Sequence, residues 1–173
     1  ACPSGVQYGL LVEQARISVE QVLPPSSFER LIHWLTLKQL LPKINRLRWI
    51  ARFLRLYQRL GLSRLVRKLN FLPGPLRTME GMLPNLPKQY RDHRVPAPAF
   101  GEKHGTVAFF HGCVQEAFLA EVNEATLRVL QRNGYEVHFP TLQTCCGAAA
   151  LHIGEEHHSK QLARQNIDAF LDY

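Results

Sequence analysis

The C-terminal part of the chain alternates between short β-rich runs and longer amphipathic stretches, and this alternation limits the fold more than any other feature. The β-rich runs are residues 106–111 and 135–139. Residues 115–133, closed by Gly134, and residues 155–173 have the apolar spacing of helices. A strand–helix–strand–helix order predicts a parallel βαβα unit. We therefore predict an α/β fold for this part, preceded by a mostly α-helical basic segment.

The apolar residues of the two expected helices define the sides that should face the sheet, because a helix buries its apolar stripe. In the first helix these residues are Phe118, Leu119, Val122, Ala125, Val129 and Leu130. In the second helix they are Leu162, Ala163, Ile167, Phe170 and Leu171.

Three of the four cysteines in the chain follow the two expected strands. Cys113 comes two residues after the first strand, and Cys145 and Cys146 come after the second, with Gly147 directly behind them. Open α/β sheets build their sites at the carboxyl ends of neighbouring parallel strands. We therefore expect the three sulfurs to meet at one edge of the sheet, where thiolates can ligate an iron–sulfur cluster.

The adjacent cysteine pair leaves other interpretations open. A turn eased by Gly147 can direct both sulfurs to one side, although neighbours in a strand face opposite ways. Alternatively, Cys145 is a buried core residue and Cys146 is incidental, or the two form a strained vicinal disulfide. A tetrahedral zinc site that uses Cys113, the pair and one further cysteine is a non-redox alternative.

The first half of the chain is expected to be helical and basic. Apolar spacing predicts helices over residues 9–23, started by Ser4, and over residues 28–72 with interruptions at Pro42 and Gly61. Residues 29–94 contain 15 Lys and Arg against 3 Asp and Glu, so an anionic partner should be sought there. Clustered proline and glycine between residues 73 and 101 predict a linker without regular structure.

Four arginines recur at helical spacing within this basic segment and predict one cationic stripe, formed by Arg48, Arg52, Arg55 and Arg59. The stripe is either a solvated face or a dock for a partner protein or anionic lipid headgroups. Nucleic-acid binding is disfavoured because the interleaved aromatic residues, among them Trp49 and Phe53, are expected on the buried face.

Histidines offer further candidate ligands in the α/β part, and His111 and His152 lie nearest to the cysteines in sequence. We interpret both as hydrogen-bonded, partly buried side chains. The sequence contains no G-x-G-x-x-G or Walker loop and no supported Ser/His/Asp arrangement, so we identify no catalytic residue.

Two cysteine motifs together resemble a known family. Gly112-Cys113 followed by Cys145-Cys146-Gly147 resembles the cysteine-rich CCG domain that occurs in heterodisulfide reductase and in the iron–sulfur subunits of several dehydrogenases. The opening Cys2-Pro3-Ser4-Gly5-Val6 resembles the end of a bacterial-type ferredoxin motif. The order of these parts, and the stretch CCGAAALHIGEEHHSKQLARQNIDAF, are similar to the iron–sulfur subunit of glycolate dehydrogenase (glycolate oxidase).

The resemblance implies three domains. Residues 1–27 would be the C-terminal end of a two-cluster 4Fe-4S ferredoxin-type domain, residues 28–102 a basic helical segment with its linker, and residues 103–173 the first part of a truncated CCG domain. Cys2 would ligate a cubane 4Fe-4S cluster, and Cys113, Cys145 and Cys146 a CCG-type cluster. Both ligand sets would be incomplete, so we expect no stable cluster in the isolated fragment.

The function that the resemblance implies is electron transfer, with no substrate chemistry in this chain. Electrons would come from flavoprotein dehydrogenase subunits that oxidise glycolate or another 2-hydroxy acid, and would pass toward a quinone. A cytoplasmic location, at the inner face of the membrane, and no nucleic-acid partner are expected. The alternatives are a heterodisulfide-reductase-like, lactate-utilisation or glycerol-3-phosphate dehydrogenase iron–sulfur subunit, or a zinc-binding module.

Overall fold

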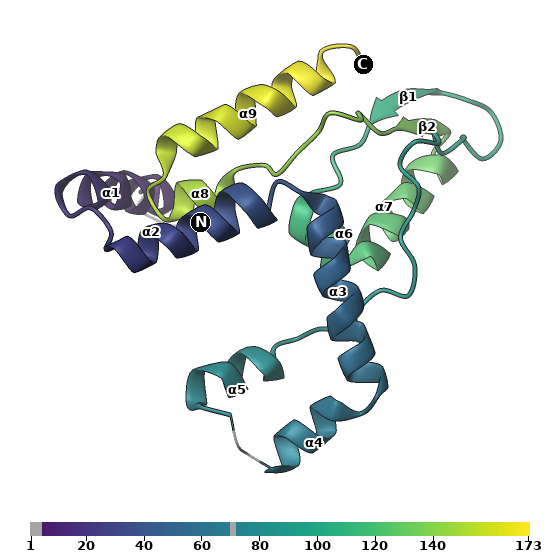
Figure 1. Cartoon of the computed structure of the whole chain (residues 1–173). Coiled ribbons are helices and arrows are strands. Elements are labelled where there is room, and N and C mark those ends of the chain that lie inside the picture. The colour runs from purple at the N-terminus through teal and green to yellow at the C-terminus, as the bar shows by residue number, and fades with distance from the viewer. Residues whose placement is uncertain (1–4, 70–71) are drawn as a thin grey trace. The chain divides into compact units, whose positions relative to one another are not determined.

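A computed structural model describes residues 5–69 and 72–173 (Figure 1). The expected helix cap at Ser4 and the expected cluster ligand Cys2 lie outside these residues. The chain forms two compact units: one combines residues up to Lys43 with Pro140–Tyr173, and the other is Ile44–Phe139. Each unit is described by itself.

The unit formed by Ile44–Phe139 contains the predicted parallel sheet. Strand β1 (Gly105–Ala108) pairs in parallel with β2 (Tyr135–His138), and Val107 lies opposite Val137. Val137 is fully buried and packs with Ala97, Leu127 and Phe139. The α/β prediction is therefore confirmed. The first strand is shorter than expected, because it ends at Ala108 and leaves a loop before Cys113.

Two helices connect the strands where one was predicted. Helix α6 (Cys113–Phe118) ends at Leu119, whose φ of −134° is not helical, and α7 (Ala120–Arg132) follows. The predicted stop at Gly134 is confirmed by its φ of +80°. A Cβ at Gly134 would lie 2.8 Å from the Glu102 carbonyl oxygen, so only glycine fits.

The side of these helices that faces inward differs from the prediction. Val122 and Val129 are exposed, whereas a stripe with several polar members is buried: Glu116, Ala120, Asn123, Leu127 and Gln131. The polar members are tolerated because they are hydrogen-bonded; Gln131 Nε2, for example, donates to the Pro98 carbonyl at 2.7 Å.

The basic segment in this unit forms α3 (Ile44–Arg59), α4 (Leu62–Leu69) and α5 (Gly74–Gly81). Gly61, with φ of +72°, separates α3 from α4 as predicted. The prediction of an irregular linker is wrong at α5. This helix starts after Pro73 and places Pro75 in its first turn, where a missing N–H leaves no helical hydrogen bond unmade.

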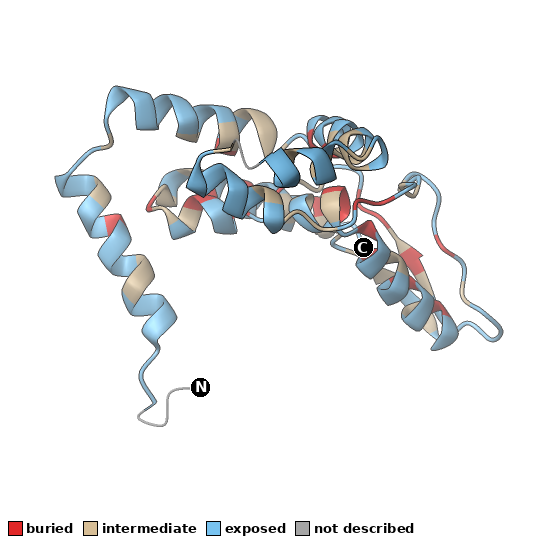
Figure 2. Cartoon of the chain, turned by 90° about the horizontal axis from the view of Figure 1, so that it is seen from below, coloured by how far each residue is buried: buried red, intermediate tan, exposed pale blue. Residues whose placement is uncertain are grey.

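The other unit is helical: α1 (Tyr8–Val22), α2 (Ser27–His33), η1 (Trp34–Leu40), α8 (Ala148–His152) and α9 (Glu156–Phe170). The π-helical turn η1 and the short α8 were not predicted. Ile17 is the buried residue of α1, whose surface is otherwise mostly exposed (Figure 2). Helix α9 buries Ser159, Leu162 and Ala169, whereas Ile167 and Leu171, expected inside, are exposed.

Helix α1 is held against the end of α8 and the connection to α9 by a side-chain hydrogen bond and a close approach of the backbone. Arg16 Nη1 donates to the His152 carbonyl at 2.7 Å. A Cβ at Gly154 would lie 3.0 Å from the Arg16 carbonyl oxygen and 3.0 Å from Glu20 Cβ, so the two segments approach closely. Within the described residues, no helix is both long and apolar enough to cross a membrane.

Candidate metal centre

The vicinal cysteines lie on a loop whose backbone is fixed by one side chain of α9. Asn166 Oδ1 accepts from Thr144 N at 2.8 Å, and Asn166 Nδ2 donates to the Cys145 carbonyl at 3.0 Å. Thr144 Oγ1 also donates to the Pro42 carbonyl at 3.3 Å. The loop is therefore ordered by contacts immediately before and at the first cysteine of the pair.

Gly147 is required directly after the pair. Its φ is +84°, in the left-handed region, and it caps the start of α8. A Cβ there would lie 3.0 Å from the Ser159 carbonyl oxygen and 3.0 Å from Ser159 Oγ. Glycine is therefore required both by the left-handed backbone and by the close approach of α9. That both sulfurs of the pair face one side stays a prediction.

The two cysteines differ in exposure. Cys145 is 3% exposed, whereas Cys146 is exposed. One thiol of the pair is therefore shielded from water and the other is accessible from outside this unit. A buried thiol beside an accessible one suits a cluster seated against the loop, where it is partly covered by protein.

Cys113 is the first residue of α6 in the other unit and is partly exposed. Gly112 precedes it with φ of +68°. The loop before it is held by Asn123 of α7, whose Nδ2 donates to the His111 carbonyl at 2.8 Å and to Glu116 Oε2 at 2.8 Å. Each cysteine loop is thus held by an asparagine side chain from a later helix. The sequence did not predict this role for Asn123 and Asn166, because the hydrogen bonds join residues that no local pattern connects.

Glu116 links this loop to α3 through a buried ion pair. Its side chain is 2% exposed, and its Oε1 accepts from Arg48 Nη2 at 2.7 Å. Arg48 is itself 17% exposed. Because Glu116 and Cys113 share one short helix, Arg48 helps to fix the position of Cys113.

Two histidine rings stack beside this pair. The His93 and His111 ring centroids are 4.5 Å apart, and His93 also stacks on Phe139 at 4.8 Å. Burial, opposed by nearby Glu116, lowers the pKa of His93 to about 4. Burial also lowers the pKa of His111. Both rings are therefore neutral at pH 7. His111 is partly buried, as expected, whereas the same expectation is wrong for His152, whose side chain is 58% exposed.

The arginine stripe does not form one solvated face. Arg48 reaches Glu116, and Arg55 Nη1 donates to the Leu86 carbonyl at 3.2 Å, while Arg52 and Arg59 are exposed. The prediction that Trp49 and Phe53 are buried is wrong, since they are 58% and 67% exposed. The face of α3 that is buried instead carries Leu47 and Ala51.

The structure brings Cys145 and Cys146 together on one loop and places Cys113 in the other unit, so the meeting of all three sulfurs stays a prediction. The residues themselves fit an iron–sulfur group. Thiolates are its preferred ligands, and both loops are held in place by hydrogen bonds to their backbones.

Comparison with known proteins places the chain among cysteine-rich proteins. Residues 107–173 match the family model described as "Cysteine-rich domain" (CCG), and residues 28–83 match "Glycolate oxidase iron-sulfur subunit, linker region". No solved structure matches.

Curated proteins of similar sequence include two iron–sulfur subunits that match almost the whole of this chain. The chain is 42% identical to the "Probable glycolate oxidase iron-sulfur subunit" of Bacillus subtilis over 98% of this chain and 39% of that protein. It is 31% identical to the "Glycolate oxidase iron-sulfur subunit" of Escherichia coli over 98% of this chain and 37% of that protein. A shorter match, 39% identical over 38% of this chain and 28% of that protein, is to "Lactate utilization protein A" of Geobacillus kaustophilus.

A parallel β1–β2 pair, a cysteine loop after each strand and the match over residues 107–173 together indicate a protein with a cysteine-rich CCG domain. Within that class, the linker model and the two long matches establish that the chain belongs to the glycolate oxidase iron–sulfur subunit family. The chain spans less than two fifths of the length of these relatives.

Proposed function

We propose that this chain is part of an iron–sulfur electron-transfer subunit of a glycolate or related 2-hydroxy acid dehydrogenase. Cys113, Cys145 and Cys146 would ligate a CCG-type cluster, and Cys2, in a ferredoxin-type segment over residues 1–27, would ligate a 4Fe-4S cubane. The observation that supports this most is the pair of asparagine-held cysteine loops at the positions of the family's motif. When bound, such clusters accept and release single electrons.

The residues of this chain would hold and tune the cluster without acting on substrate. Asn166 and Asn123 fix the ligand loops, and burial of Cys145 limits solvent access on one side. Exclusion of water and hydrogen bonding around thiolates are the means by which a protein sets a cluster's potential. Flavoprotein subunits would supply the electrons and a quinone would receive them, as the family assignment suggests.

The test is anaerobic purification of the full-length protein with single cysteine-to-serine variants at Cys113, Cys145 and Cys146. We expect a visible charge-transfer band, an electron paramagnetic resonance signal on reduction, and iron and sulfide that fall in each variant. Thr141→Ala, an exposed change in the same loop, is the matched control and should keep full iron content. Stoichiometric zinc with no signal would overturn the proposal in favour of a non-redox site.

We further propose that the unit formed by Ile44–Phe139 binds peripherally to an anionic membrane through an apolar surface of α3 and α4. The α3 row is Trp49, Phe53, Leu56 and Leu60, and the α4 row is Leu62, Leu65 and Leu69; all are at least 41% exposed. Residues 44–69 carry eight Lys and Arg and no Asp or Glu. Exposed apolar groups among cations complement anionic headgroups over an acyl layer.

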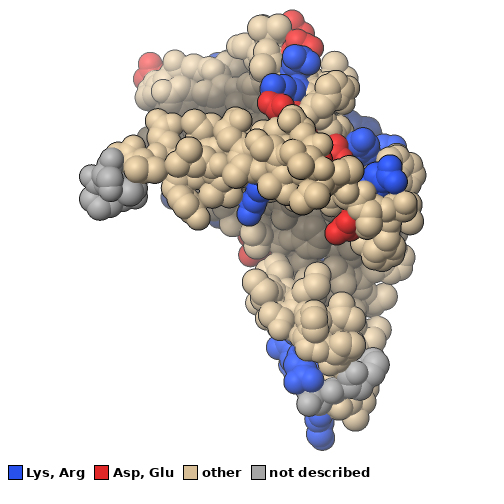
Figure 3. Space-filling view, turned by 90° about the vertical axis from the view of Figure 1, so that its left-hand side faces the viewer, with Lys and Arg blue, Asp and Glu red and all other residues tan. Residues whose placement is uncertain are grey.

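Figure 3 shows cationic side chains among uncharged ones at the lower end of the view, where α4 and α5 lie. Flotation of the full-length protein with phosphatidylglycerol-containing vesicles should exceed flotation with phosphatidylcholine alone. Phe53→Ser and Leu65→Ser should reduce it severalfold. Val129→Ser, at an exposed valine on α7, should not. Equal flotation for all variants, or none for any, would assign the surface to a protein partner.

A further inference from the structure

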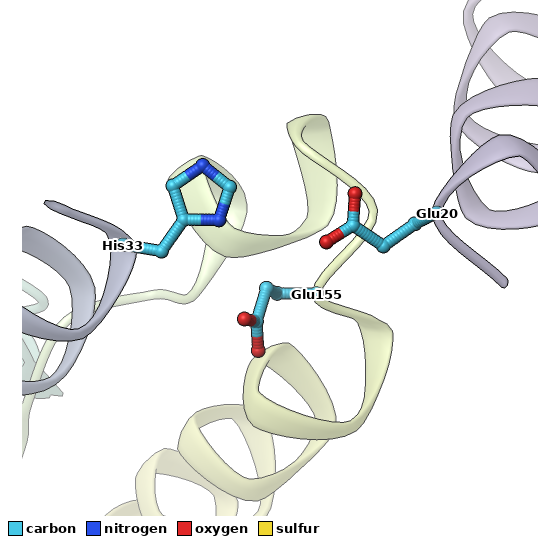
Figure 4. Close-up of side chains that lie close together, drawn as sticks. All are labelled: Glu20, His33 and Glu155. Carbon is cyan, nitrogen blue, oxygen red and sulfur yellow. The ribbon is translucent and has the colours of Figure 1, made fainter. Parts of the chain in front are cut away.

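A second group of ligand-type side chains lies away from the cysteines. Glu20 of α1, His33 at the end of α2 and Glu155 directly before α9 each present one ligand atom, and these atoms lie within 4.8 Å of one another. All three residues are partly buried and belong to the same unit. Figure 4 shows the three side chains converging from three different segments.

The positions of these residues are set by contacts that do not involve their ligand atoms. Gly154 lies against the Arg16 carbonyl and Glu20 Cβ, which brings Glu155 beside Glu20. Helix α2, which ends at His33, is started by a capping box in which Ser26 Oγ accepts from Glu29 N and Glu29 Oε2 accepts from Ser26 N. The arrangement is therefore a product of the fold.

A buried nitrogen points into this group. His33 Nδ1 exposes less than 1 Å² to solvent and has no hydrogen-bond partner among the described residues. In Figure 4 the ring nitrogen nearest the side-chain stem is turned toward the two carboxylates. Buried polar atoms are nearly always satisfied, so an unsatisfied one indicates a missing partner. Two carboxylates so close together also repel each other unless a positive charge lies between them.

We propose that Glu20, His33 and Glu155 bind a divalent transition-metal ion such as Mn²⁺ or Zn²⁺. One imidazole nitrogen and two carboxylate oxygens are a ligand set that such ions accept, with water completing the shell. Ligands about 2.1 Å from a tetrahedral ion lie about 3.4 Å apart, so small side-chain rotations close the site. The ion supplies the partner that His33 Nδ1 lacks and cancels the repulsion between the carboxylates.

The bound ion would join three segments that are far apart in sequence. It would tie α1 and α2 to the start of α9, the helix whose Asn166 holds the Cys145 loop. Its role would be structural, and it does not depend on the proposed electron transfer. Oxygen and nitrogen ligands also distinguish it from the thiolate site, because Mn²⁺ binds thiolates poorly.

The test is titration of the chelator-treated full-length protein with Mn²⁺, followed by the electron paramagnetic resonance signal of the free ion. We expect one saturable site per chain and a rise in the thermal midpoint on binding. Glu20→Gln, His33→Gln and Glu155→Gln should each weaken binding by more than about tenfold and abolish the rise. Glu156→Gln, the neighbouring carboxylate on α9, is the matched control and should bind as the unaltered protein does.

Far-ultraviolet circular dichroism would establish that each variant is folded. If the unaltered protein shows no saturable Mn²⁺ binding, or if the three variants bind as tightly as Glu156→Gln, the proposal is wrong. Cysteine-to-serine variants should leave this titration unchanged, so the outcome is separate from that of the cluster experiment.

Discussion

Asn166 Nδ2 donates to the Cys145 carbonyl at 3.0 Å while the same side chain accepts from Thr144 N at 2.8 Å. An amide is the side chain that can donate to one backbone group and accept from another nearby in this way. The geometry makes α9 the support of the vicinal-cysteine loop, so the effect of this helix on the cluster can be tested by changing one residue.

Asn166→Ala should lower the free energy of unfolding by about 1–3 kcal/mol, because two backbone groups near the loop lose their partners. It should also reduce the iron content of anaerobically purified full-length protein. Asn166→Asp keeps the acceptor for Thr144 N and loses the donor to Cys145, so it should lie between Ala and Asn. Denaturant unfolding and iron analysis measure the two effects; an unaltered iron content in Asn166→Ala would contradict the role of this clamp.

Gly147→Ala should destabilise the protein by about 1–3 kcal/mol, because a residue with a side chain is strained in the left-handed region and its Cβ would press on Ser159. Thermal unfolding measures the change. Gly9→Ala is the matched control, since Gly9 is in α1 and its Cβ would meet nothing within 4 Å. It should be neutral or stabilise by up to about 1 kcal/mol. Equal effects of the two changes would refute this reasoning.

The sequence predicted element types better than buried faces. Local sequence patterns were enough to predict the parallel strand pair. The conformational limits of proline and glycine were enough to predict the breaks at Pro42 and Gly61 and the helix end at Gly134. The buried side of α7 does not, because its inward stripe includes Asn123 and Gln131. Apolar periodicity assigns polar residues to the outside, and only tertiary hydrogen bonds reveal that these two lie inside.

The same limit applies to α3. Its apolar residues surround most of the helix, so periodicity could not tell which row packs. Ala51, fully buried, lies on the side that faces inward, and a small residue there permits a close approach. The inward direction of Arg48 likewise depends on Glu116, 68 positions later in the chain, and no local pattern contains that pairing.

Glu116→Gln should destabilise the protein by about 3–5 kcal/mol, because it leaves the charge of mostly buried Arg48 without its partner. The matched control is Glu124→Gln, which breaks the Arg91–Glu124 pair at 2.8 Å, where both side chains are about one third exposed. That change should cost less than about 1 kcal/mol. Denaturant unfolding of both variants measures the two losses of unfolding free energy. Similar losses would contradict the expectation that the buried ion pair contributes more to stability than the exposed one.

The folded state should become less stable as the pH falls from 6.5 to about 4, the interval between the ordinary pKa of His93 and its pKa in the folded chain. Burial lowers the pKa of its imidazole from 6.5 to about 4 in the folded chain. The unfolded chain therefore binds a proton that the folded chain refuses, and the stabilisation present above pH 6.5 is lost as the pH falls toward 4. We expect a loss on the order of 2 kcal/mol from this residue, after allowance for its partial exposure.

His93→Phe isolates that contribution, because a phenyl ring preserves stacking on Phe139 and cannot be protonated. Unfolding free energies measured between pH 7.5 and 4.5 should fall less steeply in this variant than in the unaltered chain. Phe100→Leu, a change at an exposed aromatic residue of the same unit, is the control and should leave the pH profile unchanged. Parallel pH profiles for His93→Phe and the unaltered chain would mean that the imidazole of His93 is protonated as readily in the folded state as in the unfolded one.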